Sequence, residues 1–291
     1  MLRPIATATA LIALALLGSA CSTHLGKPST PGPAPVQTHY ERVRDQVFTP
    51  ADWPKPLLAD VYVPEGAGPF PAVLVIHGGG WESGDRDQVK SIAKRLASRG
   101  FVAVNVTYRL VPEAIFPAQL QDVQQAVLWT RANAQRFHID PKRIGAFGYS
   151  AGAHLAALLG GIGDQPPLGK PGLAIQAVVG GGTPTDLTRS TGGGLVPRFL
   201  GGSVEQKPAA YREASPINHV NAGDPPVFLY HGGGDSLVSI DHAEDYEKAL
   251  QAAGVPTELY VLRGRGHIGA FLTDGSAVDA AIDFLDRYLR R

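Results

Sequence analysis

A serine lies between two closely spaced glycines in the run Gly-Tyr-Ser-Ala-Gly at residues 148–152. An apolar run at residues 143–147 precedes it, and the alanine- and leucine-rich stretch at 151–159 predicts a helix directly after it. A G-x-S-x-G sequence between a strand and a helix is typical of a sharp turn that exposes the serine hydroxyl for nucleophilic attack. A glycine-rich turn with an incidental serine is the alternative. We predict that Ser150 is a nucleophile.

Such a nucleophile needs a histidine base, and the histidine needs a carboxylate that orients it. Among nine histidines, His267 stands in a glycine-rich loop after the last predicted strand, at residues 258–262. Asp235 follows the strand predicted at 227–230, so both side chains are expected at the carboxyl end of a parallel sheet. Asp241 is the alternative acid, but its position predicts the start of the next helix. We therefore predict a Ser150, His267 and Asp235 set.

A second glycine-rich segment, His-Gly-Gly-Gly-Trp at residues 77–81, follows the strand predicted at 72–76. Glycines let backbone N–H groups approach a reacting carbonyl closely and hold the oxyanion of a tetrahedral intermediate. We expect the N–H groups of Gly79, Gly80 and Ala151 to serve as these donors, with His77 bracing the loop. A phosphate-binding loop is the alternative, but it would need the Lys-Ser/Thr pair and a helix directly after it.

The remaining chain is organised to position these loops. Short apolar runs at 72–76, 102–106, 143–147, 174–179, 227–230 and 258–262 fit strands buried on both faces, with two more strands predicted at 43–48 and 58–63. Helical patterns lie between them at 88–98, 118–136, 151–159, 241–252 and 276–289. This alternation predicts an α/β fold with a doubly wound, mostly parallel sheet and helices on both faces. We expect one catalytic domain over residues 40–291.

Composition excludes several classes of function. The 291 residues include 26 Lys and Arg against 26 Asp and Glu, so no basic surface for nucleic acid is expected. The single cysteine excludes an internal disulfide and zinc sites built from several cysteines. No metal or organic cofactor is implied. The sequence does not indicate an oligomeric state.

The N-terminus predicts export. Residues 1–20 hold one charge, an apolar run at 5–17 and small residues at 18–20, as a removable signal peptide does. The small residues and Cys21 resemble a bacterial lipobox, which implies acylation of Cys21 and attachment to the cell envelope, with the outer membrane favoured. Ordinary secretory cleavage is the alternative. Four prolines at 28–35 predict that residues 21–39 form an extended tether between the lipid and the domain.

With these motifs in view, the chain from about residue 40 onward resembles the α/β-hydrolase superfamily. It is most similar to carboxylesterases of the feruloyl/acetyl-esterase and hormone-sensitive-lipase-like type, in the order and spacing of six segments, at 77–81, 108–113, 140–143, 148–152, 231–235 and 264–267. The resemblance implies that Tyr108 and Arg109 support the glycine loop structurally. The elbow lacks the Asp and third glycine usual in hormone-sensitive-lipase-like enzymes, and the N-terminal region is too short for their helical cap. Both departures favour the feruloyl/acetyl-esterase branch.

The resemblance implies a serine esterase that cleaves short-chain or aryl carboxylic esters through an acyl-enzyme on Ser150. Kynurenine-formamidase-like enzymes share the H-G-G-x-W and S-A-G-x-H pieces, here with Trp81 and His154, so an N-formyl amide substrate is an alternative. A non-catalytic, lipid-anchored binding protein on a hydrolase scaffold is another. Residues 181–224 are expected to form a small lid, with a plain surface excursion as the alternative, and Trp81, Leu195 and Phe199 are candidate substrate contacts.

Overall fold

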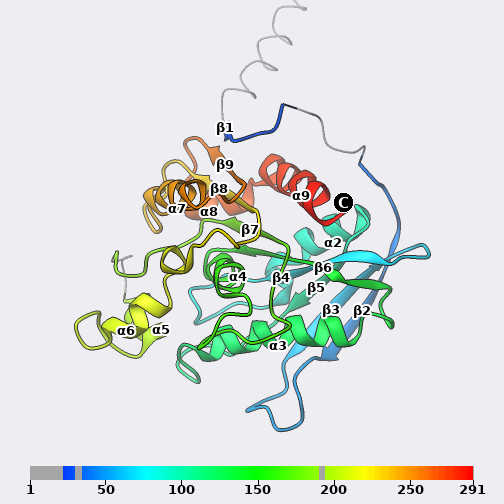
Figure 1. Cartoon of the computed structure of the whole chain (residues 1–291), viewed down its shortest axis with the longest axis horizontal. Coiled ribbons are helices and arrows are strands. Elements are labelled where there is room, and N and C mark those ends of the chain that lie inside the picture. Colours follow the sequence, from blue (N-terminus) through cyan, green and yellow to red (C-terminus); the bar gives the residue numbers. More distant parts are fainter. Residues whose placement is uncertain (1–21, 30–34, 190–193, 291) are drawn as a thin grey trace, which may run out of the picture.

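The computed structural model describes residues 22–29, 35–189 and 194–290. A single sheet of nine strands runs through them, with helices on both faces (Figure 1). In chain order the strands are β1 (Ser22–Leu25), β2 (Tyr40–Val47), β3 (Leu58–Pro64), β4 (Phe70–Ile76), β5 (Val102–Val106), β6 (Ile139–Tyr149), β7 (Ala177–Gly181), β8 (Val227–Gly232) and β9 (Thr257–Leu262).

Across the sheet the strands follow the order β1-β9-β8-β7-β6-β4-β5-β3-β2. The run from β5 to β9 is parallel throughout, whereas β2, β3 and β1 pair antiparallel at the two edges. The predicted doubly wound, mostly parallel sheet is confirmed. Because parallel neighbours end at the same edge, the loops after β4, β6, β8 and β9 meet there.

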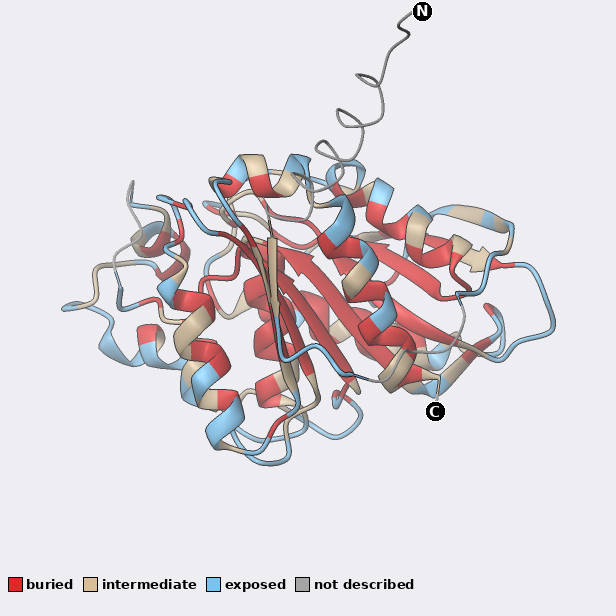
Figure 2. Cartoon of the chain, turned by 90° about the horizontal axis from the view of Figure 1, so that it is seen from above, coloured by how far each residue is buried: buried red, intermediate tan, exposed pale blue. Residues whose placement is uncertain are grey.

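The longer helices are α2 (Lys90–Ser98), α3 (Ala118–Ala132), α4 (Ala151–Ile162), α7 (Asp241–Ala252) and α9 (Gly275–Leu289). The core is divided by the sheet into two apolar clusters. Helices α3, α4 and α7 pack on one face, and α2 and α9 pack on the other. Viewed from above, the buried strands form the middle layer, and the outer helices α2, α3, α7 and α9 carry exposed residues on their solvent side (Figure 2).

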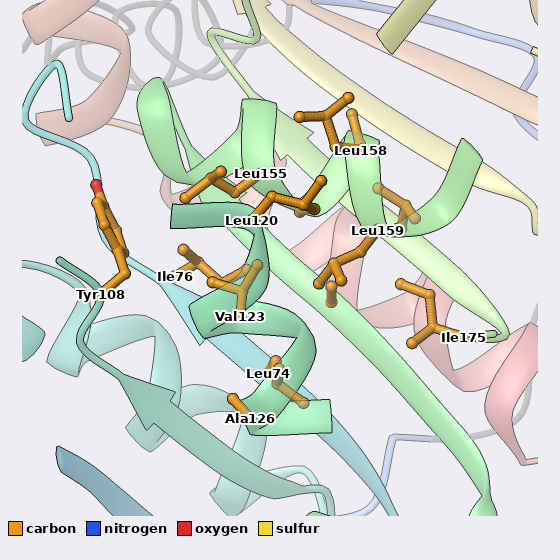
Figure 3. Close-up of a cluster of buried hydrophobic side chains, with 14 of the residues drawn as sticks. Leu74, Ile76, Tyr108, Leu120, Val123, Ala126, Leu155, Leu158, Leu159 and Ile175 are labelled. Carbon is orange, nitrogen blue, oxygen red and sulfur yellow. The ribbon is translucent and has the colours of Figure 1, made fainter. Parts of the chain in front are cut away.

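Helix α4, which starts directly after the nucleophile, is buried along its whole length except at Gly160. A helix that is apolar on every side is stable only inside a core. Its leucines meet the apolar face of α3 and the strand β4 beneath them (Figure 3). The labelled contacts include Leu74 and Ile76 of β4, Leu120 and Val123 of α3, and Leu155, Leu158 and Leu159 of α4. This packing fixes the position of the turn that carries Ser150 relative to the sheet.

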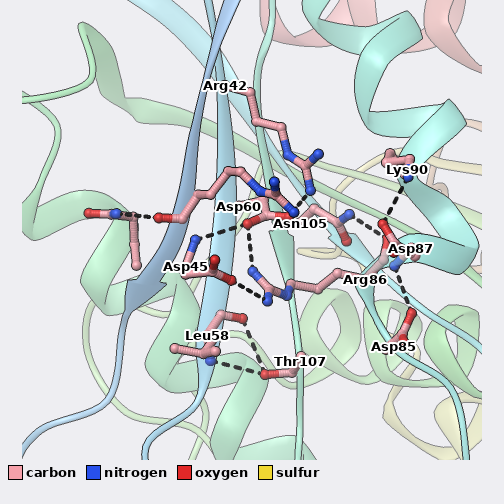
Figure 4. A network of polar contacts seen from close by, with 12 residues as sticks. Arg42, Asp45, Leu58, Asp60, Asp85, Arg86, Asp87, Lys90, Asn105 and Thr107 are labelled. Carbon is pink, nitrogen blue, oxygen red and sulfur yellow. Dashed lines mark hydrogen bonds and ion pairs between the residues drawn. The ribbon is translucent and has the colours of Figure 1, made fainter.

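A polar network holds the antiparallel edge of the sheet (Figure 4). Asp60 on β3 is buried and accepts hydrogen bonds from Arg42 on β2 and from Arg86, both at 2.6 Å. Arg86 begins the short helix η1 (Arg86–Val89), and its carbonyl oxygen accepts a hydrogen bond from Asn105 on β5 at 2.7 Å. Pairing with two guanidinium groups offsets the cost of burying the carboxylate. The network connects β2 and β3 to the segment that follows the glycine loop at residues 77–81.

Short elements were not predicted. The region 181–224 contains α5 (Leu195–Leu200), α6 (Pro208–Glu213) and η2 (Pro216–His219), and α8 (His267–Leu272) follows β9. Each is at most six residues long, so none shows the repeated spacing from which a helix is predicted. Asp241 was expected to cap α7, but Ile240 is the cap residue and Asp241 is the first residue of the helix.

The predicted signal peptide and Cys21 lie outside the described residues, as do 30–34 of the predicted tether. The expectation of an extended spacer from residue 22 is wrong for its first part, because Ser22–Leu25 form β1. This strand pairs with β9, and its His24 bonds to Glu258 at 2.7 Å, so the sheet edge supplies the partners that the segment lacks by itself. Among the described helices, none has both the length and the apolar character needed to cross a membrane.

Candidate active site

Ser150 occupies the turn between β6 and α4, with φ 54° and ψ −121°. A residue with a side chain is strained in this backbone region, and such strain is concentrated at functional turns. A Cβ atom on Gly148 would lie 2.2 Å from the carbonyl of Gly152, and one on Gly152 would lie 2.1 Å from the carbonyl oxygen of Ile76. The two glycines are therefore required by close backbone contacts. The Ser150 amide donates to the carbonyl oxygen of Gly181 at 2.7 Å, which ties the turn to β7.

The structure brings together the three side chains predicted from the sequence. Nε2 of His267 lies 2.9 Å from Oγ of Ser150, and Nδ1 lies 2.6 Å from Oδ2 of Asp235. With the imidazole proton on Nδ1, His267 donates to Asp235 and accepts the hydrogen bond of the serine hydroxyl. The side chain of Asp235 is fully buried and that of His267 is 6% exposed. Ser150, His267 and Asp235, which come from three separate loops, are thus linked in this order by hydrogen bonds.

Asp235 is held by donors on both carboxylate oxygens. Its Oδ1 accepts the backbone N–H groups of Leu237 and Val238, each at 2.9 Å. Besides His267, Nε2 of His231 lies 3.3 Å from Oδ2, while that nitrogen donates to the carbonyl oxygen of Val238 at 2.8 Å. Burial alone would raise the pKa of Asp235, but the hydrogen bonds from His231, His267 and Val238 lower it below its ordinary value. The carboxylate stays ionised beside the imidazole.

His231 was not predicted from the sequence to be part of the site. The signal was present in the run His-Gly-Gly-Gly-Asp at residues 231–235, four positions before the acid. Two histidines therefore contact one carboxylate, from β8 and from the start of α8.

The glycine loop at 77–81 lies against the nucleophile. A Cβ atom on Gly78 would lie 3.4 Å from the Cβ of Ser150, and one on Gly79, where φ is +102°, would meet the carbonyl oxygen of Ser83 at 2.0 Å. Below the loop, the His77 ring stacks on Tyr108 with centroids 4.3 Å apart. The Tyr108 hydroxyl contacts the carbonyl oxygens of His77 and Gly78 at 3.1 and 3.2 Å. The expected bracing by His77 and Tyr108 is present in the structure.

Arg109 supports the same region from farther away. It binds the buried Asp122 of α3 through its backbone N–H at 2.8 Å and its side-chain Nε at 2.9 Å. Trp53 donates to the same carboxylate at 2.8 Å. These bonds connect the segment after β5 to α3, as the structural role implied for Arg109 requires.

Trp81 and Phe199 do not contact the cavity, so their selection as substrate contacts is wrong. Trp81 is 3% exposed and Phe199 is fully buried, and their rings stack at 4.3 Å. The Trp81 indole donates to Nδ1 of His154 at 3.3 Å, and Nε2 of His154 donates to the carbonyl oxygen of Ala214 at 2.6 Å. Because each ring covers the other, neither is left for a ligand. They join the glycine loop to the region 181–224.

His154 links these elements as a neutral group. Burial lowers its pKa to about 4, and the hydrogen bond to Ala214 opposes that shift only in part. Its Nδ1 can accept from Trp81 only while it carries no proton. Its side chain is completely buried, four residues after Ser150 on α4.

A cavity of about 400 Å³ opens above Ser150. Leu195, the third candidate contact, lines it, and a Cβ atom on Gly80 would lie 3.0 Å from Cδ2 of this leucine. Gly79, Gly80 and His267 line it too, whereas Ala151 lies directly behind Ser150 as the first residue of α4. Lining residues that the sequence did not reveal are Glu82, Ser83, Gln88, Tyr149, Leu237, Ile268 and Phe271.

Helix α5 is joined to the glycine loop by an ion pair. Arg198 of α5 pairs with Glu82, and one of its bonds, from Nη2 to Oε2, is 3.1 Å long. Together with Leu195 over Gly80, this pair places the start of α5 along one wall of the cavity. The region 181–224 therefore contributes to the wall, as the lid prediction requires, while motion of the region stays a prediction.

Comparison with known proteins identifies the family of the chain. The BD-FAE family model matches residues 59–250. Esterase LipC of Mycobacterium tuberculosis is 32% identical over 225 residues, which cover 72% of this chain and 55% of LipC. Esterase LipQ of the same organism is 31% identical over 231 residues, covering 74% of this chain and 55% of LipQ. The chain thus spans about half the length of the curated relatives it matches.

Solved structures give the same result for the fold. A truncated carbohydrate esterase from gut microbiota superposes with a TM-score of 0.75 and 25% identity, covering 89% of this chain and 100% of that one. Esterase 2 of Thermogutta terrifontis superposes with a TM-score of 0.71 and 27% identity, covering 89% and 95%. The family match includes β3 to α7, among them the glycine loop, the serine turn and Asp235. The chain therefore belongs to the BD-FAE family of the α/β-hydrolase superfamily.

Proposed function

We propose that this protein is a serine carboxylesterase that cleaves short-chain or aryl carboxylic esters through an acyl-enzyme on Ser150. The observation that carries the proposal is the chain of hydrogen bonds from Ser150 to His267 at 2.9 Å and from His267 to Asp235 at 2.6 Å. A serine next to a base that is itself oriented by a carboxylate is the arrangement that nucleophilic acyl transfer needs.

In the first half-reaction, Nε2 of His267 takes the hydroxyl proton of Ser150 while Oγ attacks the ester carbonyl carbon. The carbonyl oxygen becomes an oxyanion, for which the N–H groups of Gly79, Gly80 and Ala151 are the proposed donors. Asp235 keeps the proton of His267 on Nδ1 and stabilises the imidazolium. The imidazolium then protonates the alcohol oxygen, the C–O bond breaks, and the acyl group remains on Ser150.

In the second half-reaction, water replaces the alcohol. His267 removes a proton from this water as its oxygen attacks the acyl carbon, and a second oxyanion forms in the same place. Collapse of this intermediate returns the proton to Oγ of Ser150 and releases the carboxylic acid. The chain supplies every proton transfer, and no metal or cofactor takes part in the proposed steps.

The cavity supports a small substrate. Its volume of about 400 Å³ suits one short acyl or aryl group with its alcohol, and Leu195, Leu237 and Phe271 give it apolar walls. LipC and LipQ carry the name esterase, and one solved structure of Thermogutta terrifontis esterase 2 is described as phosphorylated by paraoxon. These relatives support ester hydrolysis by this chain and labelling by an organophosphorus probe.

The decisive experiment uses Ser150→Ala. The variant should lose labelling by a fluorophosphonate probe, and its turnover of p-nitrophenyl acetate should fall at least about a thousandfold. Ser91→Ala, a substitution at an exposed position of α2, should keep both. Parallel rates on feruloyl, longer p-nitrophenyl and N-formyl substrates define the preferred acyl group. Wild-type turnover by Ser150→Ala would refute the proposal, and a folded wild-type chain without turnover or labelling would favour a binding protein.

We further propose that the protein is exported and attached to the bacterial cell envelope by acylation of Cys21. The apolar run at residues 5–17, the small residues before Cys21 and the absence of any other cysteine support this attachment. Cells that express the wild-type chain with radiolabelled palmitate should label it, and Cys21→Ser should abolish the label. A labelled Cys21→Ser chain, or an unlabelled wild-type chain in the culture medium, would favour ordinary secretion.

A further inference from the structure

The N-terminal strand β1 begins at the end of the sheet that carries the active site. β1 lies beside β9 (Figure 1). Because the two strands are antiparallel, Ser22 lies opposite Leu262 and Leu25 lies opposite Leu259. Ser22 is therefore at the carboxyl end of β9, the end from which the chain continues to His267. The hydroxyl of Tyr260 donates to Oγ of Ser22 at 2.9 Å, which helps to hold the strand there. Ser22, the first described residue, therefore lies at the end of the sheet that carries the active site.

Large apolar side chains are exposed at this same edge. Leu237 is 38% exposed, Ile268 is 63% exposed and Leu272 is 73% exposed, and we call these three the apolar rim. Ile268 and Leu272 lie four residues apart on α8 and therefore share a face of that helix. Leu237 and Ile268 both line the mouth of the cavity. Neighbouring apolar groups left in water indicate a surface that is covered by a partner or a membrane.

Two cationic side chains flank the apolar rim. Arg263 and Arg265 are exposed in the connection between β9 and α8. Among the described residues neither forms an ion pair, whereas Arg95 of α2 is paired with Asp279 of α9. Unpaired arginines beside exposed aliphatic groups are the combination by which peripheral proteins bind phosphate headgroups and the outer acyl region together.

From these features we infer that this edge docks on a bilayer that contains anionic phospholipid. The apolar rim enters the boundary between headgroups and acyl chains, and Arg263 and Arg265 contact lipid phosphates. A symmetric pair of protein copies would bring each arginine pair towards its own equivalent, and that repulsion disfavours a second copy as the occupant. Docking in this way turns the mouth of the cavity towards the lipid surface, on the side where Ser22, the first described residue, lies.

The inference goes beyond ester hydrolysis, and its test needs no catalysis. The chain over residues 22–291, which holds every described strand and helix and has no acyl group, is mixed with vesicles of phosphatidylethanolamine and phosphatidylglycerol and floated on a density gradient. The wild-type chain should float with these vesicles at low salt, and the bound fraction should fall with added salt or in pure phosphatidylcholine. Ser150→Ala should float as well as the wild type.

Matched variants distinguish vesicle binding by the apolar rim from non-specific adsorption through any exposed apolar residue. Leu272→Asp should lower the vesicle partition constant about tenfold, because it removes an exposed leucine and adds a charge that anionic lipid repels. Val47→Asp makes the same kind of change at a 52% exposed residue on β2, at the opposite edge of the sheet, and should leave the partition constant unchanged. The Arg263→Gln, Arg265→Gln double variant should weaken binding and reduce its salt dependence. Thermal melting checks that each variant is folded.

Three results would overturn the inference. The wild-type chain could fail to float with anionic vesicles, or Leu272→Asp and Val47→Asp could have equal effects. Light scattering could also reveal a dimer that Leu272→Asp dissociates while vesicle binding is absent, which would assign the rim to a second copy. Since Ser150→Ala decides catalysis and flotation decides docking, failure of one proposal leaves the other standing.

Discussion

The hydroxyl of Tyr149 donates to the backbone carbonyl oxygen of His267 at 2.6 Å, although the two residues are 118 positions apart in sequence. Tyr149 is the last residue of β6, directly before the nucleophile, and its ring packs on Phe271 with centroids 4.7 Å apart. Burial raises the pKa of Tyr149 well above its ordinary value, so the phenol stays protonated and keeps donating. The strand that presents Ser150 thus also holds the loop that presents its base.

We expect Tyr149→Phe to lower kcat for p-nitrophenyl acetate about tenfold, the kinetic equivalent of one lost hydrogen bond, with little change in KM. The phenylalanine ring keeps the packing, so the loss reports the position of His267. Tyr211→Phe is the matched control, because its hydroxyl also bonds a backbone carbonyl oxygen, that of Gly202 at 3.2 Å, away from the cavity. A Tyr149→Phe variant with wild-type kcat would show that the bond does not position the base.

His231 is expected to act through Asp235. Replacing it with Asn removes the donor that lies 3.3 Å from the carboxylate, so kcat should fall about tenfold. Asp235→Asn removes the carboxylate that sets the tautomer of His267, and it should lower kcat about 10⁴-fold. His231→Gln can extend an amide N–H further than Asn, and it should recover part of the loss. Steady-state kinetics on the three variants checks this order, and equal rates for His231→Asn and wild type would contradict it.

Gly148→Ala should lower the free energy of unfolding by at least about 3 kcal/mol, because the new methyl group would lie 2.2 Å from the Gly152 carbonyl and force the turn apart. Gly275→Ala at the start of α9 is the control, since a Cβ atom there meets nothing within 4 Å. That change should be neutral or slightly stabilising. Urea titrations of both variants measure the difference. Equal stability of the two would mean that the turn has room for a side chain.

Acid should destabilise the fold through His154. Its pKa is about 4 in the folded chain and about 6.5 when unfolded, so between these pH values the unfolded state binds more protons. The free energy of unfolding therefore falls as the pH drops from about 6.5, by about 3 kcal/mol at pH 4. His154→Gln should show a smaller fall, with part retained because burial also lowers the pKa of His242 to about 4. Urea titrations at pH 7 and pH 4.5 test this, and identical falls for wild type and variant would contradict it.

Much of the site could be predicted because its signals are local. Ser150, the glycine loop, Asp235 and His267 each follow a predicted strand directly, and parallel strands bring their carboxyl ends to one edge whatever the details of packing. The glycines were interpretable for the same reason, since a sharp turn or a close backbone approach constrains residues within a few positions.

The predictions for Trp81 and for the segment at Ser22 were wrong because residues distant in sequence determine the structure at these positions. Trp81 cannot contact a substrate because the ring of Phe199 on α5 stacks on it. The strand at Ser22 forms because it pairs with the free edge of β9. The short helix α8 and the wall that Leu195 forms have no periodic signal of their own, so their positions depend on the surfaces they contact.

The sequence by itself determined the α/β order and the chemical groups of the proposed esterase, because strand ends and tight turns are encoded by neighbouring residues. Only the tertiary structure decided which side chains support those groups, which face the cavity and which face solvent. The bond from Tyr149 to His267, the approach of His231 to Asp235 and the exposure of Leu272 join or uncover residues that no short-range pattern relates. Packing across the sheet creates these contacts, and they exist only when the whole chain has folded.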